Sequence, residues 1–454
     1  MNEGAVGGWW YRDAAESRGT APPLLRGKLN SDVTGASVGP NSWSLWSWRG
    51  VPLQAPRPHV HTSTPSHFHT LIYLDHAATT PLDPVVLEVM RPYLTGTFGN
   101  PSSPHGAGRA ARVAVEEARE KVAAVLRCAP AEIVFTSGGT EADNAALRGV
   151  LTGEALAETR RPGLVTSAAE HEAILRTAEA LADEGHPVTV LSPGTAGAPT
   201  VDDVAGASGA DTGLVSVMVV NNETGAVADV AGTAGVAHAA GALMHCDAVQ
   251  AAGYMDLDVD ALGVDLLSLS AHKVRGPKGA GGLFIRAGTP FSPLLRGGAQ
   301  ERRRRGGTEN VAAIVGFGEA LARADAGREA ESARVAALRD RLRRRVEDAF
   351  GTGVVVNTPA GAASHILSLS FPPVGGRAVD GEMLLAGLDV AGVCASAGSA
   401  CTSGALEPSH VLLAMGAARD TAGATLRFSM GAATTIEEID TAAAVLADVV
   451  SRLR

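Results

Sequence analysis

The chain is long enough for two domains, and its composition is that of a globular protein with a large core. It has 454 residues, of which 45% are hydrophobic and 19% charged, and a formal net charge of −10. This acidic balance argues against nucleic acid or an anionic membrane as a partner, and no apolar stretch is long enough to span a bilayer. The four cysteines form no CxxC pair, which is typical of a reducing compartment and predicts a cytoplasmic location.

Residues 1–70 differ from the rest of the chain. All five tryptophans lie here among many Ser, Pro and Gly residues, and neither helical nor alternating periodicity is sustained. We expect a poorly ordered extension, or sequence upstream of the true start. The histidines of this segment lack carboxylate or cysteine partners at ligand spacing, so no metal site is expected. They are His59, His61, His67 and His69.

From Leu71 onward, short apolar runs alternate with Ala-rich helical segments such as Arg109–Val125 and Glu141–Val150. Many runs are rich in Val, Ile and Leu on both faces, which is typical of a mostly parallel sheet covered by helices. The expected strands are residues 71–75, 132–138, 163–171, 187–193, 214–220, 242–249, 265–273 and 281–286. The predicted fold class is therefore α/β.

A domain boundary is expected near residue 325. A long charged helix is predicted from about residue 327 to residue 350, and a second α+β segment follows it. Its last helix opens on a capping-box pattern, Thr435 with Glu438. We therefore expect a large domain over 71–325 and a small domain over 326–454. The first residues of the large domain either lie within it or pack against the small domain.

The turn Ser137-Gly138-Gly139-Thr140 joins a predicted strand to a predicted helix. It presents backbone N–H groups and the positive end of the helix dipole to an anion, and phosphate is the natural guest. No Gly-Lys-Ser or Gly-Lys-Thr follows, so this is not the Walker pattern. Taken alone, the turn also suits a purely structural role, or a non-catalytic nucleotide-binding protein built on the same sheet.

Two other strand ends carry residues suited to cofactor chemistry. Asp247 and Gln250 follow an apolar run. A carboxylate at such a position needs a cation, for example the protonated ring nitrogen of pyridoxal phosphate. Alternatively, Asp247 only caps the next helix. Lys273 ends another run, where desolvation lowers an amine pKa and frees a nucleophile. Lys278 lies in a glycine loop and is expected to be solvated. Lysine is rare in this chain, which has it only at positions 28, 121, 273 and 278.

The motifs that carry these residues follow one order along the chain. They are YLDHAATTP from Tyr73, GNPSSPH from Gly99, SGGTEADN from Ser137, AAEHEA with His171, NNETG from Asn221, HCDAVQ, SLSAHKVRGPKG, GGTEN from Gly306, SAGSACTSG with Cys401 and TLRFSMG with Arg427. In this set and order, residues 71–454 resemble the pyridoxal-phosphate-dependent cysteine desulfurases of the class-V aminotransferase family, in particular the nitrogenase-type and iron-sulfur-cluster-assembly group. The resemblance implies the type I fold of pyridoxal-phosphate-dependent transferases, with a mostly parallel seven-stranded sheet between helices and a smaller α+β C-terminal domain.

The resemblance also assigns roles to residues. The implied catalytic residues are Lys273, which would hold the cofactor as a Schiff base, Cys401 as the nucleophile, and His171, which would also stack on the ring. Asp247 would meet the ring nitrogen and Gln250 the ring hydroxyl. The other implied cofactor-binding residues are Gly139, Thr140, Ser270, His272 and, from the partner subunit, Thr308. Asn222 and Arg427 would bind the substrate, and a homodimer is expected because Thr308 is useful only across an interface.

Cys401 lies in a segment, residues 396–404, of small residues without a bulky apolar anchor, so we expect a mobile exposed loop. The implied reaction takes sulfur from L-cysteine, releases L-alanine and leaves a persulfide on Cys401. The acceptor would be a protein of iron-sulfur cluster assembly or of tRNA thiolation. A selenocysteine lyase or another pyridoxal-phosphate-dependent β-lyase is the alternative.

Overall fold

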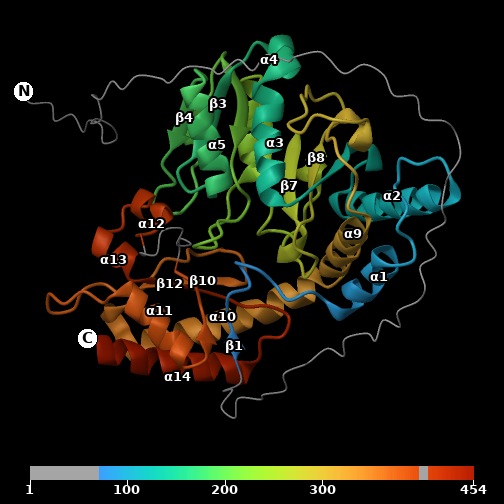
Figure 1. The fold of residues 1–454 in the computed structure, drawn as a ribbon. Coiled ribbons are helices and arrows are strands. Elements are labelled where there is room, and N and C mark those ends of the chain that lie inside the picture. Colours follow the sequence, from blue (N-terminus) through green and yellow to red (C-terminus); the bar gives the residue numbers. More distant parts are fainter. Residues whose placement is uncertain (1–70, 398–406) are drawn as a thin grey trace, which may run out of the picture. The chain divides into compact units, whose positions relative to one another are not determined.

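The computed structural model describes residues 71–397 and 407–454. Its largest sheet has seven strands in the order β2-β8-β7-β6-β5-β3-β4 (Figure 1). Only β8 runs against its neighbours, and the remaining pairs are parallel. The strands are β2 Ile133–Thr136, β3 Gly163–Ser167, β4 Val188–Leu191, β5 Thr212–Ser216, β6 Leu243–Asp247, β7 Leu266–Ser270 and β8 Gly281–Ile285. The predicted α/β class with a mostly parallel sheet is confirmed.

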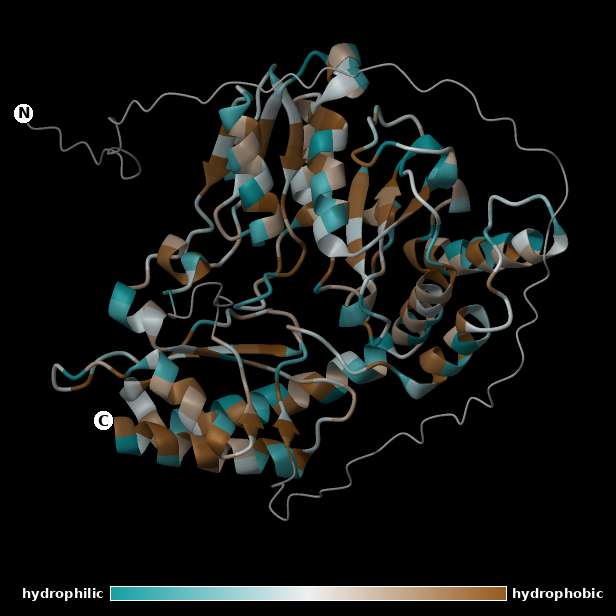
Figure 2. Cartoon of the chain, in the orientation of Figure 1, coloured by the Kyte–Doolittle hydropathy of each residue, from teal (hydrophilic) through white to brown (hydrophobic). Residues whose placement is uncertain are grey.

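Helices cover both faces of this sheet because its strands are apolar on both faces. Every residue of β2, β3, β5, β7 and β8 is buried, and Figure 2 shows the strands as mostly hydrophobic. Along β2, Ile133 and Phe135 pack with helices α2 (Gly106–Leu126) and α9 (Val311–Ala326), whereas Val134 packs with α3 (Gly139–Leu151) on the opposite face. Successive side chains therefore alternate between two separate cores.

A second, three-stranded antiparallel sheet in the order β12-β10-β9 lies with its own core among the C-terminal helices. Its strands are β9 Val355–Val356, β10 Ile366–Ser370 and β12 Thr425–Ser429, and the helices packed on it are α10 Arg328–Phe350, α11 Gly381–Val390 and α14 Ile436–Leu453. The expected strand over 71–75 is the short β1 (Ile72–Tyr73), which pairs in parallel with β11 (Val393–Cys394) and not with the large sheet. Ile72 and Leu74 are buried in this C-terminal core, which explains the difference.

The helices predicted from periodicity are present with shifted ends. The region expected as Arg109–Val125 is α2, the region expected as Glu141–Val150 is α3, and the long charged helix is α10. The capping box of α14 also forms, since the Thr435 hydroxyl accepts from the Glu438 N–H at 3.2 Å and the Glu438 carboxylate accepts from the Thr435 N–H at 2.8 Å. The remaining α-helices are α1 Pro84–Leu94, α4 Gly153–Thr159, α5 Glu172–Asp183, α6 Val201–Ala207, α7 Val230–Ala239, α8 Val259–Leu262, α12 His410–Ala414 and α13 Arg419–Gly423. None of the helices in residues 71–397 and 407–454 combines the length and hydrophobicity of a membrane span.

The turn Gln300–Arg303 has an unusual backbone. Glu301, Arg302 and Arg303 have φ angles of 45°, 55° and 66°, a left-handed conformation that costs non-glycine residues about 1–2 kcal/mol each. A buried ion pair holds the turn in place, because both carboxylate oxygens of Glu301 accept from the Arg119 guanidinium, at 2.7 and 2.8 Å. Glu301 also accepts from the Phe135 N–H at 2.9 Å, which ties the turn to β2.

Candidate active site

A cavity of about 410 Å³ lies at the carboxyl ends of the strands of the large sheet. Ten of the twelve residues predicted for the site line it, although they are spread over nearly 300 positions of the chain. They are Gly139, Thr140, His171, Asn222, Asp247, Gln250, Ser270, His272, Lys273 and Arg427. The strand ends therefore bring the predicted residues together as expected.

The N-terminus of α3 forms one end of this cavity. Gly138, the residue before the helix, has a φ of 152°, which favours glycine, and no side chain caps the helix. A Cβ on Gly281 would lie 2.7 Å from the Gly138 Cα, so β8 packs tightly against the turn. The first N–H groups of α3 thus stay available beside Gly139 and Thr140 for an anion.

Asp247 is the last residue of β6 and also lines the cavity. Its Oδ1 accepts from the Val249 N–H at 2.8 Å, whereas its Oδ2 accepts no hydrogen bond from the described residues. Burial raises the pKa of Asp247, and the nearby His171 and Lys273 oppose this rise. The neighbouring Gln250 donates from its amide to the Ala77 carbonyl at 2.8 Å. A carboxylate with a free oxygen in a buried position is ready to receive a cationic N–H group.

Lys273 follows β7 and projects into the cavity. Its Nζ donates to the carbonyl oxygens of Ala77 and Ala78, the latter at 2.9 Å. Burial lowers the pKa of the amine from 10.5 to about 8, with Arg427 acting in the same direction and Asp247 against it. At pH 7 about a tenth of the amine is therefore neutral and nucleophilic, far more than for an ordinary lysine. Lys278, the rival from the glycine loop, is exposed as predicted.

Ser270 and His272 flank the exit of β7 next to Lys273. Ser270 is buried and His272 is partly buried. Burial and the charge of Lys273 lower the pKa of His272 to about 4, so its ring is neutral at pH 7. The Nδ1 of His272 lies 3.1 Å from the Thr79 hydroxyl, which fixes the ring orientation. These two side chains offer neutral hydrogen-bonding groups to an anion.

Arg427 lies in the middle of β12 and is only 5% exposed. Its Nη1 donates to the Asn222 carbonyl and its Nη2 to the Asp75 carboxylate, both at 2.9 Å. The Nε–H group is buried and has no hydrogen-bond partner among the described residues. The guanidinium thus retains unused donors in the cavity, which suit a carboxylate.

His171 lies at the mouth of the cavity as the N-cap of α5. Its Nδ1 accepts from the Ala173 N–H at 3.1 Å, so a neutral ring carries its proton on Nε2. The ring is exposed and shares the cavity lining with Ser396 and His410. Ser396 is fixed to β12 by two backbone hydrogen bonds with Arg427, at 3.1 and 2.6 Å.

Sequence reasoning missed several polar residues of the cavity and its surroundings. Asp143 lines the cavity, is 1% exposed and has an Oδ1 without a hydrogen-bond partner in the described chain. Glu223 and His410 also line it, and their side chains approach to 3.8 Å. Asp75 pairs with Arg427 from the other end of the chain. Asp75, Asp143 and Glu223 all lie within the sequence motifs given above, and this position could have indicated that they belong to the site.

Two predicted residues are not in the cavity lining. Thr308 is exposed and is absent from it, so its role across an interface stays a prediction. Cys401 lies outside the described residues. Of the other cysteines, burial raises the pKa of Cys128 to about 12 and also raises the pKa values of Cys246 and Cys394. These three thiols are therefore weak nucleophiles.

Comparison with known proteins decides the family. The aminotransferase class-V family model matches residues 72–441. The chain belongs to the class-V aminotransferase family. The protein named Cysteine desulfurase IscS from Dictyoglomus turgidum is 42% identical over 384 residues, which cover 84% of this chain and 95% of the relative.

Solved structures of similar proteins agree with this family. One named NifS-like protein matches with a TM-score of 0.77 and 35% identity, covering 84% of this chain and all of its own. Another, named SspA in complex with cysteine, matches with a TM-score of 0.68 and 33% identity, covering 79% of this chain and 98% of its own. The resemblance to cysteine desulfurases seen in the motifs is confirmed.

Class-V aminotransferases of this kind depend on pyridoxal phosphate, which confirms the predicted cofactor. The cavity of this family member fits that group. The uncapped start of α3 suits its phosphate, the free oxygen of Asp247 suits its ring nitrogen, and the low-pKa amine of Lys273 suits its aldehyde.

Proposed function

We propose that this chain is a cysteine desulfurase that converts L-cysteine to L-alanine and holds the removed sulfur on Cys401. Lys273, Asp247 and Arg427 meet in one cavity, and this convergence is the observation that carries the proposal. In the net reaction, the C–S bond of cysteine breaks and an S–S bond forms on Cys401. The S–H bond of Cys401 also breaks and a C–H bond forms at Cβ of alanine, while the persulfide carries one proton in place of the substrate thiol proton. The reaction therefore balances without an external oxidant or reductant.

The residues of the cavity divide the binding of the cofactor. Asp247 holds the ring nitrogen, Gln250 the ring hydroxyl, and His171 covers the ring. The phosphate is bound by Gly139, Thr140, Ser270 and His272, with Thr308 of a partner copy. Pyridoxal phosphate supplies an aldehyde and a ring that accepts electrons from the substrate Cα. The Lys273 amine would hold the aldehyde carbon, and the free amine would take the substrate Cα proton at Nζ.

Substrate orientation falls to Arg427 and Asn222. Because Nη1 and Nη2 of Arg427 each make one hydrogen bond within the described chain, each keeps a second N–H that a substrate carboxylate can accept from. Asp75 pairs with the Arg427 guanidinium at 2.9 Å. The complex with cysteine named for one similar structure supports the choice of substrate.

Cys401 is the sulfur carrier by elimination and by chain connectivity. The three other cysteines have raised pKa values and none of them lines the cavity. Along the sequence, the nearest described cavity residue before Cys401 is Ser396, and the nearest after it is His410. A segment this short keeps Cys401 within reach of the cavity. Proton exchange with its thiol is the role of His171, whose neutral ring offers Nε2–H.

Mass spectrometry tests this function. After brief exposure of the protein to L-cysteine, the peptide that contains Cys401 is expected to carry one added sulfur atom, with alanine released in the same amount. Cys401→Ser serves as the control and is expected to keep the cofactor absorbance while losing the sulfur adduct. Sulfur on a different cysteine, or pyruvate in place of alanine, would contradict the proposal, and pyruvate would indicate a β-lyase.

The partners proposed here are a second copy of the chain and a sulfur-acceptor protein of iron-sulfur cluster assembly or tRNA thiolation. Exposed apolar side chains on α1 and the loop after it support the dimer. They are Val85, Leu87, Leu94 and Phe98, exposed by 44%, 40%, 62% and 80%. Cytoplasmic location is proposed because the chemistry needs free thiols, and Cys128, Cys246 and Cys394 are free.

A further inference from the structure

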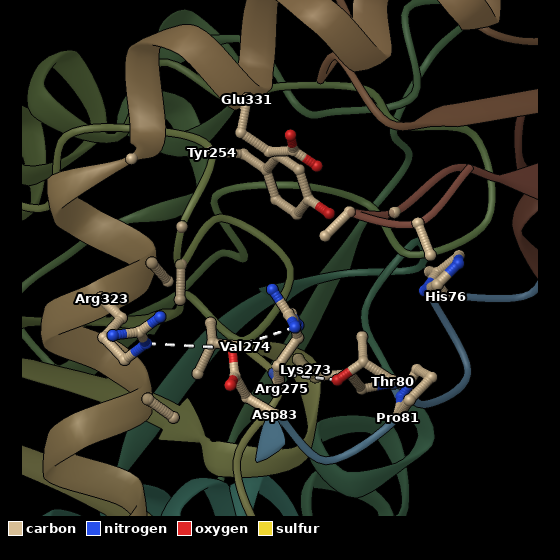
Figure 3. Close-up of a pocket in the computed structure, with 18 of the residues that line it drawn as sticks. His76, Thr80, Pro81, Asp83, Tyr254, Lys273, Val274, Arg275, Arg323 and Glu331 are labelled. Atoms are coloured by element: carbon tan, nitrogen blue, oxygen red, sulfur yellow. Dashed lines mark hydrogen bonds and ion pairs between the residues drawn. The ribbon is translucent and has the colours of Figure 1, made fainter. Parts of the chain in front are cut away.

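A second cavity of about 390 Å³ is lined by Lys273 and by none of the other described residues proposed to bind the cofactor. Within residues 71–397 and 407–454, Lys273 alone lines both cavities. Figure 3 shows Asp83, Arg275 and Arg323 together at one end of the second cavity, with Tyr254 and Glu331 at the other. The first site makes no use of these five side chains. A volume of this order is typical of a small-molecule site.

Positive charge at the first end exceeds what the protein neutralises. The single carboxylate of Asp83 serves two guanidinium groups, that of Arg275 at 2.9 Å and that of Arg323 at 3.8 Å. Its other oxygen already accepts from the Val85 N–H at 2.8 Å. The Arg323 side chain makes no hydrogen bond to the described residues, so its five N–H donors face solvent or a ligand.

The backbone is arranged to direct Arg275 to this end. Arg275 has a φ of 64°, an unfavourable conformation for a non-glycine residue. Three backbone contacts hold it there. The Arg275 N–H donates to the Thr80 hydroxyl at 2.8 Å, the Asp83 N–H donates to the Arg275 carbonyl at 3.0 Å, and the Thr80 hydroxyl donates to the His272 carbonyl at 2.7 Å.

The lining also includes apolar walls and a tyrosine, Tyr254, at the end opposite Arg275 and Arg323. Besides these and Asp83, the polar or charged residues of the lining are His76, Thr80, Lys273, Glu331 and Arg334. Val86, Val274, Ala320 and Ala324 contribute to the walls. The Tyr254 hydroxyl makes no hydrogen bond within the described chain, while the Tyr254 ring is fixed by stacking on His365, with centroids 3.8 Å apart. At that end Glu331 is neutralised by Arg334 through hydrogen bonds of 2.8 and 2.9 Å. An inorganic anion would leave these apolar walls uncovered.

We propose that this second cavity binds a small organic carboxylate with a planar apolar body. Its carboxylate lies between Arg275 and Arg323, its body lies against the apolar walls, and a polar atom at its far end meets the Tyr254 hydroxyl. The inference is independent of the proposed desulfurase activity, because the ligand would occupy the opposite side of the Lys273 segment and its binding is measured directly.

Calorimetric titration of the full, cofactor-loaded chain with benzoate and with indole-3-acetate tests the proposal, and the neutral amides of both compounds serve as matched probes. Saturable binding of at least one carboxylate and none of its amide is expected. Arg323→Gln and the cavity-filling Ala324→Leu should each weaken that binding at least about tenfold. Arg452→Gln removes an exposed guanidinium from α14 and should leave binding unchanged.

Arg427→Gln shows which cavity the probe occupies, because Arg427 is the guanidinium of the substrate site that suits a carboxylate. Binding should persist in Arg427→Gln. Loss of binding in Arg427→Gln with retention in Arg323→Gln would overturn the proposal. So would equal affinity for the amides, unchanged affinity in both Arg323→Gln and Ala324→Leu, or no saturable binding of either carboxylate at millimolar concentration. Far-ultraviolet circular dichroism of each variant verifies that it is folded.

Discussion

The two main sheets contribute to the active-site cavity in different ways. The seven-stranded sheet delivers side chains from the ends of its strands, as with Asp247 after β6 and Lys273 after β7. The three-stranded sheet delivers Arg427 from the middle of β12, and its partner Asp75 is 352 positions away in the sequence. The cofactor side of the cavity therefore follows from local strand-end rules. The substrate side depends on a pairing between distant parts of the chain.

The largest effect is expected on the strand-end side, from Lys273→Ala. It removes the amine that binds the cofactor aldehyde, so turnover should fall by at least about a thousandfold. Borohydride treatment should fix the cofactor to the wild-type peptide that contains position 273 and to no peptide of the variant. Covalent fixation at Lys278 instead would break the assignment.

Lys273→Met measures how much the buried amine destabilises the folded protein, independently of its reaction with the cofactor. The depressed pKa means that the folded protein resists protonation at Lys273 between about pH 8 and 10.5, where the unfolded chain already binds the proton. Stability of the wild-type apoprotein relative to Lys273→Met should therefore fall as the pH drops through this window and then level off. The change is about 3 kcal/mol at most, and smaller because solvent partly reaches the amine. Urea unfolding of both proteins at several pH values measures it, and a difference independent of pH would exclude a depressed pKa.

Arg427→Lys tests the long-range side of the comparison. A lysine keeps the charge but loses the planar fork, so KM for L-cysteine should rise about ten- to a hundredfold. Absorbance and affinity of the bound cofactor should stay unchanged, because the variant leaves the strand ends intact. Loss of cofactor in Arg427→Lys would show that the two sides of the cavity are not separable.

The smallest effect on the cavity is expected from Phe98→Asp, which tests the dimer. Placing a charge on this side chain, 80% exposed in the single chain, should shift the protein toward a monomer in light scattering. Val190→Asp on β4, at a position 50% exposed, is the matched control and should leave the mass unchanged. A wild-type protein that is itself monomeric would remove the basis for Thr308 acting in trans.

Sequence patterns predicted the residues whose placement depends on their own strand. Apolar runs that end at Thr136, Asp247 and Ser270 indicated the turn at Gly139 and Thr140, Asp247, Gln250 and Lys273. The other cavity residues, His171, Asn222, Ser270, His272 and Arg427, were predicted only from the family resemblance of the motifs. The segment 71–75 was expected to be a strand placed either in the large domain or against the small one. Its pairing with β11 depends on a distant core, which the local sequence pattern does not describe.

Asp143, Glu223 and His410 were missed for a similar reason. Each is an ordinary polar residue of a helix or turn in the sequence, and only the tertiary arrangement brings it to the cavity. The predicted boundary near residue 325 and the loop role of Cys401 stay predictions.

The Arg119–Glu301 ion pair has a consequence for proteolysis. The turn held by this ion pair contains the exposed Arg302 and Arg303, after which trypsin can cleave. Their left-handed backbone conformation is unfavourable, so the turn would rearrange once the ion pair is lost. Removing one of these two buried charges leaves the other without a partner, which destabilises the folded protein by about 3–5 kcal/mol. Trypsin cleavage after these arginines should therefore be slow in the wild type and rapid in Glu301→Gln. The cleavage rate thus measures how stably the turn is attached to β2 at the edge of the large sheet.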